Sequence, residues 1–288
     1  MPLTNNLKES LQKELGIQIR NVQTIGGGCI NETYKIIAEQ SFFFCKINSA
    51  TKFPQLFQKE ASGLSYLKKQ NVIKLPDVLA QFEEAGKQVL VLEWITTGTR
   101  TESFWKNFGT AVAALHHVSH TYFGFEEDNY MGSIPQPNNP ANDWVTFFKT
   151  QRLEPLVLQC VRKELLTERQ VALFEKIYQQ LPGFFEVENP ALLHGDLWSG
   201  NFMCNSQSEP VLIDPAVYYG HRSIDLGMST LFGGFRNNFY EAYHYHYPLP
   251  KNYEEQWQLC NLYALLIHLF LFGKSYLPQI ENIMQRFQ

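Results

Sequence analysis

The pattern of hydrophobic and polar residues changes about one third of the way along the 288-residue chain. Before residue 96, apolar residues gather in short runs rich in β-branched and aromatic side chains, which is typical of strands. The expected strands are 17–24, 32–38, 41–47 and 88–94. One helix is expected among them, at 53–69, because its apolar residues recur at helical spacing.

After residue 96 the pattern is mostly helical. The expected helices are 103–118, 142–160, 168–181, 253–272 and 278–287. Two short apolar runs, 191–193 and 211–213, are expected to form a buried hairpin. These elements predict an α+β fold with a small antiparallel β-sheet lobe carrying one helix (1–95) and a larger, mostly helical lobe (96–288). The cleft between such lobes is the usual place for a ligand.

Composition and charge exclude several classes of protein and partner. Charged residues make up 18% of the chain and aromatic residues 14%, which argues against disorder and against a coiled coil. The net charge of −4 supplies no basic surface for nucleic acid or an anionic membrane, so neither partner is expected. The longest apolar run, 262–272, is shorter than the roughly 18 residues that span a bilayer. With no secretion signal, a cytoplasmic protein with five reduced cysteines is expected.

The most informative segment is HGDLWSGN at 194–201, which is followed by Asp214 at the end of an apolar strand. The spacing H-x-D-x-x-x-x-N with a later Asp is the arrangement of protein kinases. There Asp196 would take the proton of the attacking hydroxyl, while Asn201 and Asp214 would hold Mg²⁺ between the phosphates of ATP. Each residue alone could simply form a turn, but the joint spacing favours a kinase.

A glycine-rich segment lies between the first two expected strands. It contains Gly26, Gly27, Gly28, Cys29 and Asn31. Glycines allow the backbone to approach a triphosphate and to offer N–H groups to it, so the segment is a candidate for nucleotide binding. Because it matches neither common phosphate-loop pattern, an ordinary hairpin turn is the alternative.

Lys46 lies in a very apolar expected strand, where a buried ammonium group needs a partner. Glu60, fourteen residues later in the expected helix, would form the Lys–Glu ion pair that positions nucleotide phosphates in kinases. The possible substitutes are Glu39, Glu83 and Glu84. For Lys46 and Glu60 alike, an ordinary solvated charge is the other alternative.

The expected strand 88–94 runs into the segment that connects the lobes. In a kinase-like fold this segment is the hinge, where backbone groups of Glu93, Trp94 and Ile95 would bind the adenine edge. An ordinary linker between lobes is the alternative.

Taken together, these residues resemble the fructosamine-3-kinase family, also called ketosamine or ribulosamine 3-kinases, in the aminoglycoside phosphotransferase branch of the kinase-like fold. The resemblance extends over nearly the whole chain. Its segments are GGGCINETYKI (26–36), FQKEASGLSYL (57–67), FGFEEDNYMGSIPQPN (123–138), HGDLWSGN (194–201), DPAVYYGHRSIDLGMSTLFGGF (214–235) and NLYALLIHLFLFG (261–273). The Trp of HGDLWSGN is a further likeness to this family, because related choline and aminoglycoside kinases usually lack it.

The resemblance implies ATP-dependent phosphorylation of the 3-hydroxyl of a ketosamine, free or protein-bound, which leads to deglycation. It also implies that Asp225, together with His194, braces the catalytic loop, although Asp225 could instead favour a helix N-terminus through the dipole. Trp198 and Trp144 are candidates for packing on the sugar or on its lysine stem, and Arg152 for orienting Trp144 or a substrate oxygen. For these three residues, core packing or a structural ion pair is the alternative.

Several alternatives and open points accompany this interpretation. Ser223 stands where the family pattern leads us to expect an acidic residue. If that side chain helps to set substrate choice, the substrate preference of the family is in doubt for this chain. The enzyme alternative is a small-molecule kinase for an aminoglycoside, choline or another amino-alcohol, and the non-enzymatic alternative is a nucleotide-binding pseudokinase. Cys29 is a candidate for redox control, because its thiol could link two chains that are otherwise monomers. His116 and His117 are expected to cap the helix 103–118.

Overall fold

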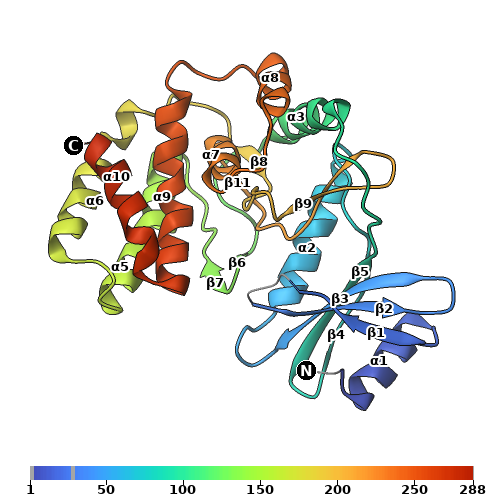
Figure 1. Cartoon of the computed structure of the whole chain (residues 1–288). Helices are drawn as coiled ribbons and strands as arrows, with labels where there is room; N and C mark the ends of the chain where they lie inside the picture. Colours follow the sequence, from blue (N-terminus) through green and yellow to red (C-terminus); the bar gives the residue numbers. More distant parts are fainter. Residues whose placement is uncertain (1–2, 27–29, 288) are drawn as a thin grey trace.

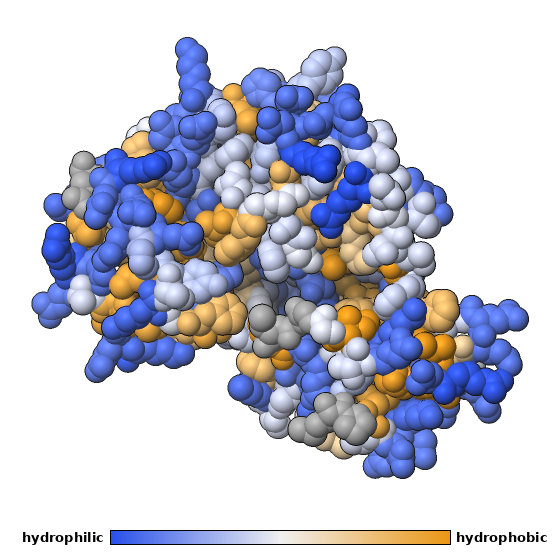
Figure 2. Space-filling model, viewed as in Figure 1, coloured by the Kyte–Doolittle hydropathy of each residue, from blue (hydrophilic) through white to orange (hydrophobic). Residues whose placement is uncertain are grey.

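The computed structural model describes residues 3–26 and 30–287. The chain forms two lobes, a sheet lobe from the N-terminal part and a mostly helical lobe from the remainder (Figure 1). On the face shown in Figure 2, hydrophilic residues predominate, and hydrophobic residues appear near the junction of the lobes. The predicted fold class is confirmed, whereas the boundary at residue 95 stays a prediction.

Strands of the first lobe form one antiparallel sheet in the order β1-β2-β3-β5-β4. They are β1 (Asn21–Thr24), β2 (Glu32–Ile37), β3 (Phe42–Ser49), β4 (Val78–Glu84) and β5 (Lys87–Glu93). Successive side chains of β5 point to opposite faces, so Val89 and Val91 join the core beneath α1 (Asn5–Leu15), while Leu90 and Leu92 join the core on the side of α2 (Leu56–Lys69). Helix α2 therefore lies between the sheet and the helical lobe (Figure 1).

Helices build most of the second lobe. They are α3 (Glu102–His116), α4 (Trp144–Phe147), the π-helix η1 (Phe148–Leu153), α5 (Glu154–Arg162), α6 (Glu168–Gln180), the 3-10 helix η2 (Leu181–Gly183), α7 (Ser223–Leu231), α8 (Asn237–His246), α9 (Tyr253–Phe272), the 3-10 helix η3 (Lys274–Tyr276) and α10 (Leu277–Arg286). Helix α3 packs on α8, and α7 packs on the buried α9. Within the described ranges, no helix is long and apolar enough to cross a membrane.

Short strand pairs frame the loops of the second lobe. They are β6 (Asn129–Met131) with β7 (Ile134–Gln136), β8 (Ala191–Leu193) with β11 (Tyr218–Gly220), and β9 (Phe202–Cys204) with β10 (Pro210–Leu212). The predicted hairpin between 191–193 and 211–213 is wrong, because each segment pairs with another strand. The segment 194–201 leaves β8 and reaches β9, and the segment from 213 returns to β11, so the two loops lie between the strand pairs.

Candidate active site

An ion cluster joins the two lobes at Lys46. Its ammonium Nζ lies 2.7 Å from Oε1 of Glu60 on α2 and 2.6 Å from Oδ1 of Asp214, which follows β10. The Lys46 side chain is 2% exposed and that of Asp214 is 41% exposed. The structure therefore contains the predicted Lys46–Glu60 pair, and it adds Asp214 as a second carboxylate on the same ammonium group.

Charge within this cluster is unbalanced. Burial alone would lower the pKa of Lys46, but Asp214 and Glu60 outweigh it and raise that pKa, so the ammonium stays protonated. Burial raises the pKa of Glu60 to about 7; Lys46 opposes this rise, and the negative charge of Asp214 adds to it. Two carboxylates thus share one cation.

Asp196 and Asn201 lie together on the loop between β8 and β9. The amide Nδ2 of Asn201 donates to the backbone oxygen of Asp196 at 2.9 Å and to its Oδ2 at 2.8 Å. Burial raises the pKa of Asp196 to about 8, and the charges of Asp214 and Asp225 act in the same direction, whereas the bond from Asn201 lowers it. The Asp196 carboxylate therefore binds a proton more readily than an exposed one.

The backbone of this loop is tightly constrained at Gly195. Its φ is +84°, and a Cβ atom there would lie 2.0 Å from the carbonyl oxygen of Ala216. Only glycine fits such a close approach at positive φ. The residue immediately before Asp196 is therefore fixed by sterics as well as by hydrogen bonds.

Asp225 on α7 holds the loop from beneath, as expected. Its Oδ2 accepts the backbone N–H of His194 at 2.8 Å, and its Oδ1 accepts that of Gly195 at 2.9 Å. In the His194 ring, Nδ1 accepts the N–H of Asp196 at 3.2 Å, so Nε2 carries the hydrogen and donates to the Ile213 carbonyl at 2.9 Å. His194 thereby ties the loop to the residue before Asp214, and burial lowers its pKa and keeps it neutral.

His116 is a further part of this brace that the sequence did not reveal. Its Nε2 lies 3.1 Å from Oδ2 of Asp225, and its Nδ1 lies 2.8 Å from the hydroxyl of Tyr243 on α8. A hydrogen on Nε2 suits the carboxylate and leaves Nδ1 to accept from Tyr243. The expectation that the His116 side chain caps α3 is therefore wrong, because the ring is fully buried and points to Asp225.

The three candidates for substrate contact separate into two groups. Trp198 is 36% exposed, meets the ring of Phe232 edge-on at 5.8 Å, and lies over Gly200, where an added Cβ would be 2.4 Å from its ring. It thus remains on the surface of the catalytic loop.

Trp144 and Arg152 lie in the interior. Trp144 stacks on Phe148 at 5.0 Å, and the Arg152 guanidinium lies 4.0 Å from the ring of Tyr218 and donates to Oδ1 of Asn138 at 2.6 Å. Their exposed fractions are 4% and 0%, so the expected substrate contact is corrected to core packing, the alternative reading.

The structure describes only some of the residues of the first lobe that are candidates for nucleotide binding. Gly26 follows β1, whereas Gly27, Gly28 and Cys29 lie outside the described residues. Oδ1 of Asn31 accepts a hydrogen bond from Nδ2 of Asn48 at 2.7 Å. This bond fixes the Asn31 side chain against the sheet.

The hinge segment follows β5 directly. The N–H of Glu93 is donated to the Asp77 carbonyl at 2.9 Å, and Glu93 is also the ladder partner of Phe43 on β3, so the binding of an adenine edge here stays a prediction. Trp94 is half-buried, with the ammonium group of Lys35 4.2 Å from its ring.

The donor set at Asn201 and Asp214 fits Mg²⁺. No group of three or more His, Cys, Asp or Glu side chains in the described part of the chain could hold a metal ion. Magnesium does not require one, since it prefers oxygen ligands and completes its shell with water and phosphate oxygens. With Nδ2 of Asn201 engaged by Asp196, the amide oxygen is the atom left for a cation, beside the partly exposed carboxylate of Asp214.

The fold and this site define the class: a two-lobed phosphotransferase of the kinase-like type. The model of the fructosamine kinase family matches residues 3–288, and the chain belongs to that family. A probable ketoamine kinase of Lactiplantibacillus plantarum is 38% identical over 93% of this chain and 95% of its own. The chloroplastic protein-ribulosamine 3-kinase of Arabidopsis thaliana is 35% identical over 93% of this chain and 82% of its own.

Solved structures agree with this assignment. The crystal structure of a protein described as a fructosamine-3-kinase from Thermobifida fusca superposes with a TM-score of 0.90 at 29% identity, covering 99% of both chains. An aminoglycoside phosphotransferase in a ternary complex with AMP-PNP and hygromycin B has a TM-score of 0.65 at 12% identity over 98% of this chain and 97% of its own. The second likeness concerns the fold alone.

Proposed function

We propose that the protein transfers the γ-phosphoryl group of ATP, with Mg²⁺, to the 3-hydroxyl of a ketosamine. The observation that carries the proposal is the assembly of Lys46, Glu60, Asp214, Asp196 and Asn201 at one site in a member of the fructosamine kinase family. The names of its relatives, ketoamine kinase and protein-ribulosamine 3-kinase, support the substrate class.

Each residue has a distinct part in this transfer. Asp196 would accept the proton of the attacking hydroxyl, and the raised pKa of its carboxylate suits a base. Lys46, held by Glu60, would contact the nucleotide phosphates, and Asn201 and Asp214 would hold Mg²⁺. When bound, the cation would neutralise charge on the phosphates.

The surroundings of the catalytic loop favour a ketosamine over a polycationic antibiotic or choline. Those substrates call for several free carboxylates. Of the acids at 126–128, Glu126 is exposed, but Glu127 is engaged by Lys59, and Asp128 accepts the N–H of Asn138 at 2.8 Å. Trp198 offers an exposed aromatic surface that suits a sugar or an aliphatic lysine stem.

The product would explain a role in deglycation. A 3-phosphate close to the ketoamine carbon leaves readily after enolisation. Its elimination, followed by hydrolysis, frees the original amine and leaves a deoxy-dicarbonyl sugar. The protein is needed only for the phosphorylation step.

A coupled ADP-release assay with ribulose-lysine, fructose-lysine, kanamycin and choline tests the proposal, with ³¹P NMR to locate the phosphate. We expect turnover with the two ketosamines and phosphate on O3. Turnover confined to kanamycin or choline would overturn the substrate class, and nucleotide binding without any turnover would favour a pseudokinase.

A further inference from the structure

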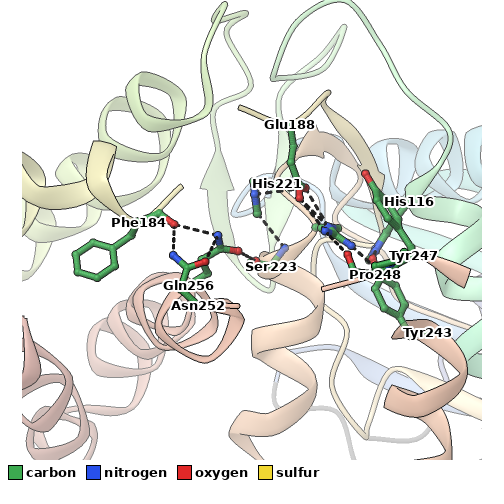
Figure 3. A network of polar contacts seen from close by, with 11 residues as sticks. His116, Phe184, Glu188, His221, Ser223, Tyr243, Tyr247, Pro248, Asn252 and Gln256 are labelled. Carbon is green, nitrogen blue, oxygen red and sulfur yellow. Dashed lines mark hydrogen bonds and ion pairs between the residues drawn. The ribbon is translucent and has the colours of Figure 1, made fainter. Parts of the chain in front are cut away.

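A largely buried ion pair joins Arg222 to Glu188, close to His116 of the brace. Figure 3 shows Glu188 and His116 in the same network of polar contacts. Nε of Arg222 donates to Oε2 of Glu188 at 2.9 Å, and Nη2 donates to Oε1 at 2.7 Å. The guanidinium also donates to the carbonyls of Tyr247 at 3.1 Å and Pro248 at 2.8 Å. The side chains of Arg222 and Glu188 are 4% and 19% exposed. Bidentate, charge-assisted bonds of this kind are strong and directional.

This ion pair connects the beginning of the segment 188–195 to the beginning of the segment 222–225, and hydrogen bonds connect the ends of the same two segments. Glu188 lies three residues before β8, and β8 runs directly into His194 and Gly195. Arg222 immediately precedes α7, whose third residue, Asp225, accepts the N–H groups of His194 and Gly195. The two segments are therefore cross-linked at both ends.

The first turn of α7 is anchored in the same place. Nδ1 of His221 accepts the N–H of Ser223 at 3.2 Å, and the Ser223 hydroxyl donates to Oε1 of Gln256 on α9 at 2.9 Å. The carbonyl of Arg222 itself accepts the N–H of Leu226 at 3.3 Å. A shift of Arg222 would consequently move the turn that carries Asp225.

The loop held by Asp225 depends on such support. Glycine adopts many backbone conformations at little cost, so the conformation of Gly195 is fixed by its close approach to Ala216 and by its bond to Asp225 rather than by the residue itself. Asp196 is the next residue. A misplacement of about 1 Å in a reacting group can lower a rate roughly 10²-fold.

We propose that Arg222 and Glu188 are positioning residues, which orient the carboxylate of Asp196 through Asp225. The inference rests on the proposed kinase function for its kinetic readout. Because the pair acts on the loop and makes none of the Lys46 contacts that face the nucleotide, its loss should lower kcat and spare the KM for ATP.

Steady-state kinetics of R222Q, R222K and E188Q test this split. R222Q should lower kcat by about tenfold, with the KM for ATP changed by less than about twofold. R222K keeps the charge without the planar fork, and E188Q keeps the shape without the charge, so both should fall between R222Q and wild type. The matched control is R20Q, which breaks the exposed Arg20–Glu39 pair and should leave kcat unchanged.

Amide hydrogen exchange supplies a readout that needs no turnover. In folded variants, well below the melting temperature, exchange at His194 and Gly195 should accelerate more than exchange in β3. The proposal is overturned if R222Q and E188Q match R20Q in kcat and exchange, or if β3 accelerates equally, which would indicate a general loss of stability. Should wild type phosphorylate no ketosamine, the proposed function fails, and exchange alone decides on the ion pair.

Discussion

Two charged clusters pair a cation with carboxylate groups inside the molecule. The Lys46 cluster contains Glu60 and Asp214, and the Arg222 cluster contains Glu188 and the neighbouring His221 and Ser223. The two differ in how far the cation stabilises the ionised carboxylates. Asp196 adjoins the first cluster through the charge of Asp214, and burial raises the pKa values of Glu60 and Asp196 to about 7 and about 8. Around Arg222, burial opposes the ionisation of Glu188, yet the bonds from Arg222 prevail and lower its pKa. In the first cluster, therefore, the carboxylates lack enough positive charge nearby to stabilise their ionised forms. In the second cluster, Arg222 stabilises the ionised form of Glu188.

Under the proposed function, this difference separates a site that would bind a ligand from one that holds structure. Carboxylates that share too little positive charge destabilise the folded chain, and a bound cation relieves them. A balanced, fully hydrogen-bonded pair stays as it is whatever binds nearby. Neutralising one carboxylate beside Lys46 should thus impair activity without loss of stability, whereas substitutions in the Arg222 cluster should impair stability or loop geometry.

The largest effect is expected from Asp196→Asn. Removal of the proposed base should lower kcat by about 10² to 10⁴. ATP affinity from isothermal titration should hardly change, since Asn keeps the shape. Thermal unfolding should show no loss of stability, because a buried carboxylate that resists ionisation is gone.

Asp77→Asn is the control, as it removes an exposed carboxylate paired with Lys68. If the Asp196 variant keeps more than a tenth of the wild-type rate, Asp196 is not the base. A large fall in its melting temperature would contradict the comparison of the two clusters.

The residues of the candidate site could be predicted because they lie at characteristic distances along the chain. Asp196 and Asn201 share one loop, and Lys46 and Glu60 are 14 residues apart. The residues that hold this loop in place have no characteristic spacing in the sequence. His116 is 109 residues from Asp225, and Glu188 is 34 from Arg222, so only the folded chain pairs them.

The fold was predictable where a pattern is long. Helix α9 was identified from its apolar run, whereas α7, which is buried on nearly all sides, shows no clear periodicity. The N-terminal α1 was missed because only Leu7 and Leu11 on it are buried, although its cap at Thr4 is visible in the sequence. The predicted pairing of β8 with β10 is wrong because a run of three apolar residues does not determine which strand it pairs with.

The second prediction concerns the pH dependence of stability in the Arg222 cluster. Burial lowers the pKa of His221 from 6.5 to about 4. Between pH 6.5 and about 4, the His221 imidazole is protonated in the unfolded chain but stays neutral in the folded protein. Stability is therefore retained above about pH 6.5, and up to about 3 kcal/mol is lost as the pH falls towards 4.

His221→Asn should remove this contribution, and its amide oxygen can still accept the N–H of Ser223. Urea unfolding from pH 7.5 to 4.5 should show the free energy of unfolding falling more steeply in wild type than in the variant. His117→Asn, at a more exposed ring, is the control. Parallel curves for wild type and the His221 variant would show that this ring does not set the acid sensitivity.

The third prediction returns to the Lys46 cluster. Asp214 has a φ of +55°, a conformation that Asn adopts more readily than most residues, so Asp214→Asn should fold. Loss of the charge of this proposed Mg²⁺ ligand should raise the Mg²⁺ concentration needed for half-maximal rate by about tenfold, which corresponds to about 1.4 kcal/mol. A magnesium titration of the initial rate measures this, and an unchanged midpoint would mean that the cation is held elsewhere.

The smallest effect is expected from Ser223→Ala, at the position where the family pattern led us to expect an acid. The Ser223 side chain is 2% exposed and bonds to Gln256, so it faces the interior and not a substrate. Loss of this bond should lower the free energy of unfolding by about 1 kcal/mol. The ratio of kcat/KM for ribulose-lysine to that for fructose-lysine should stay unchanged.

Ser229→Ala is the matched control, because Ser229 is another buried serine of α7, and its hydroxyl donates to the Leu226 carbonyl at 2.6 Å. A changed ratio in the Ser223 variant alone would show that the Arg222 cluster also governs substrate choice, and the division between the two clusters would fail.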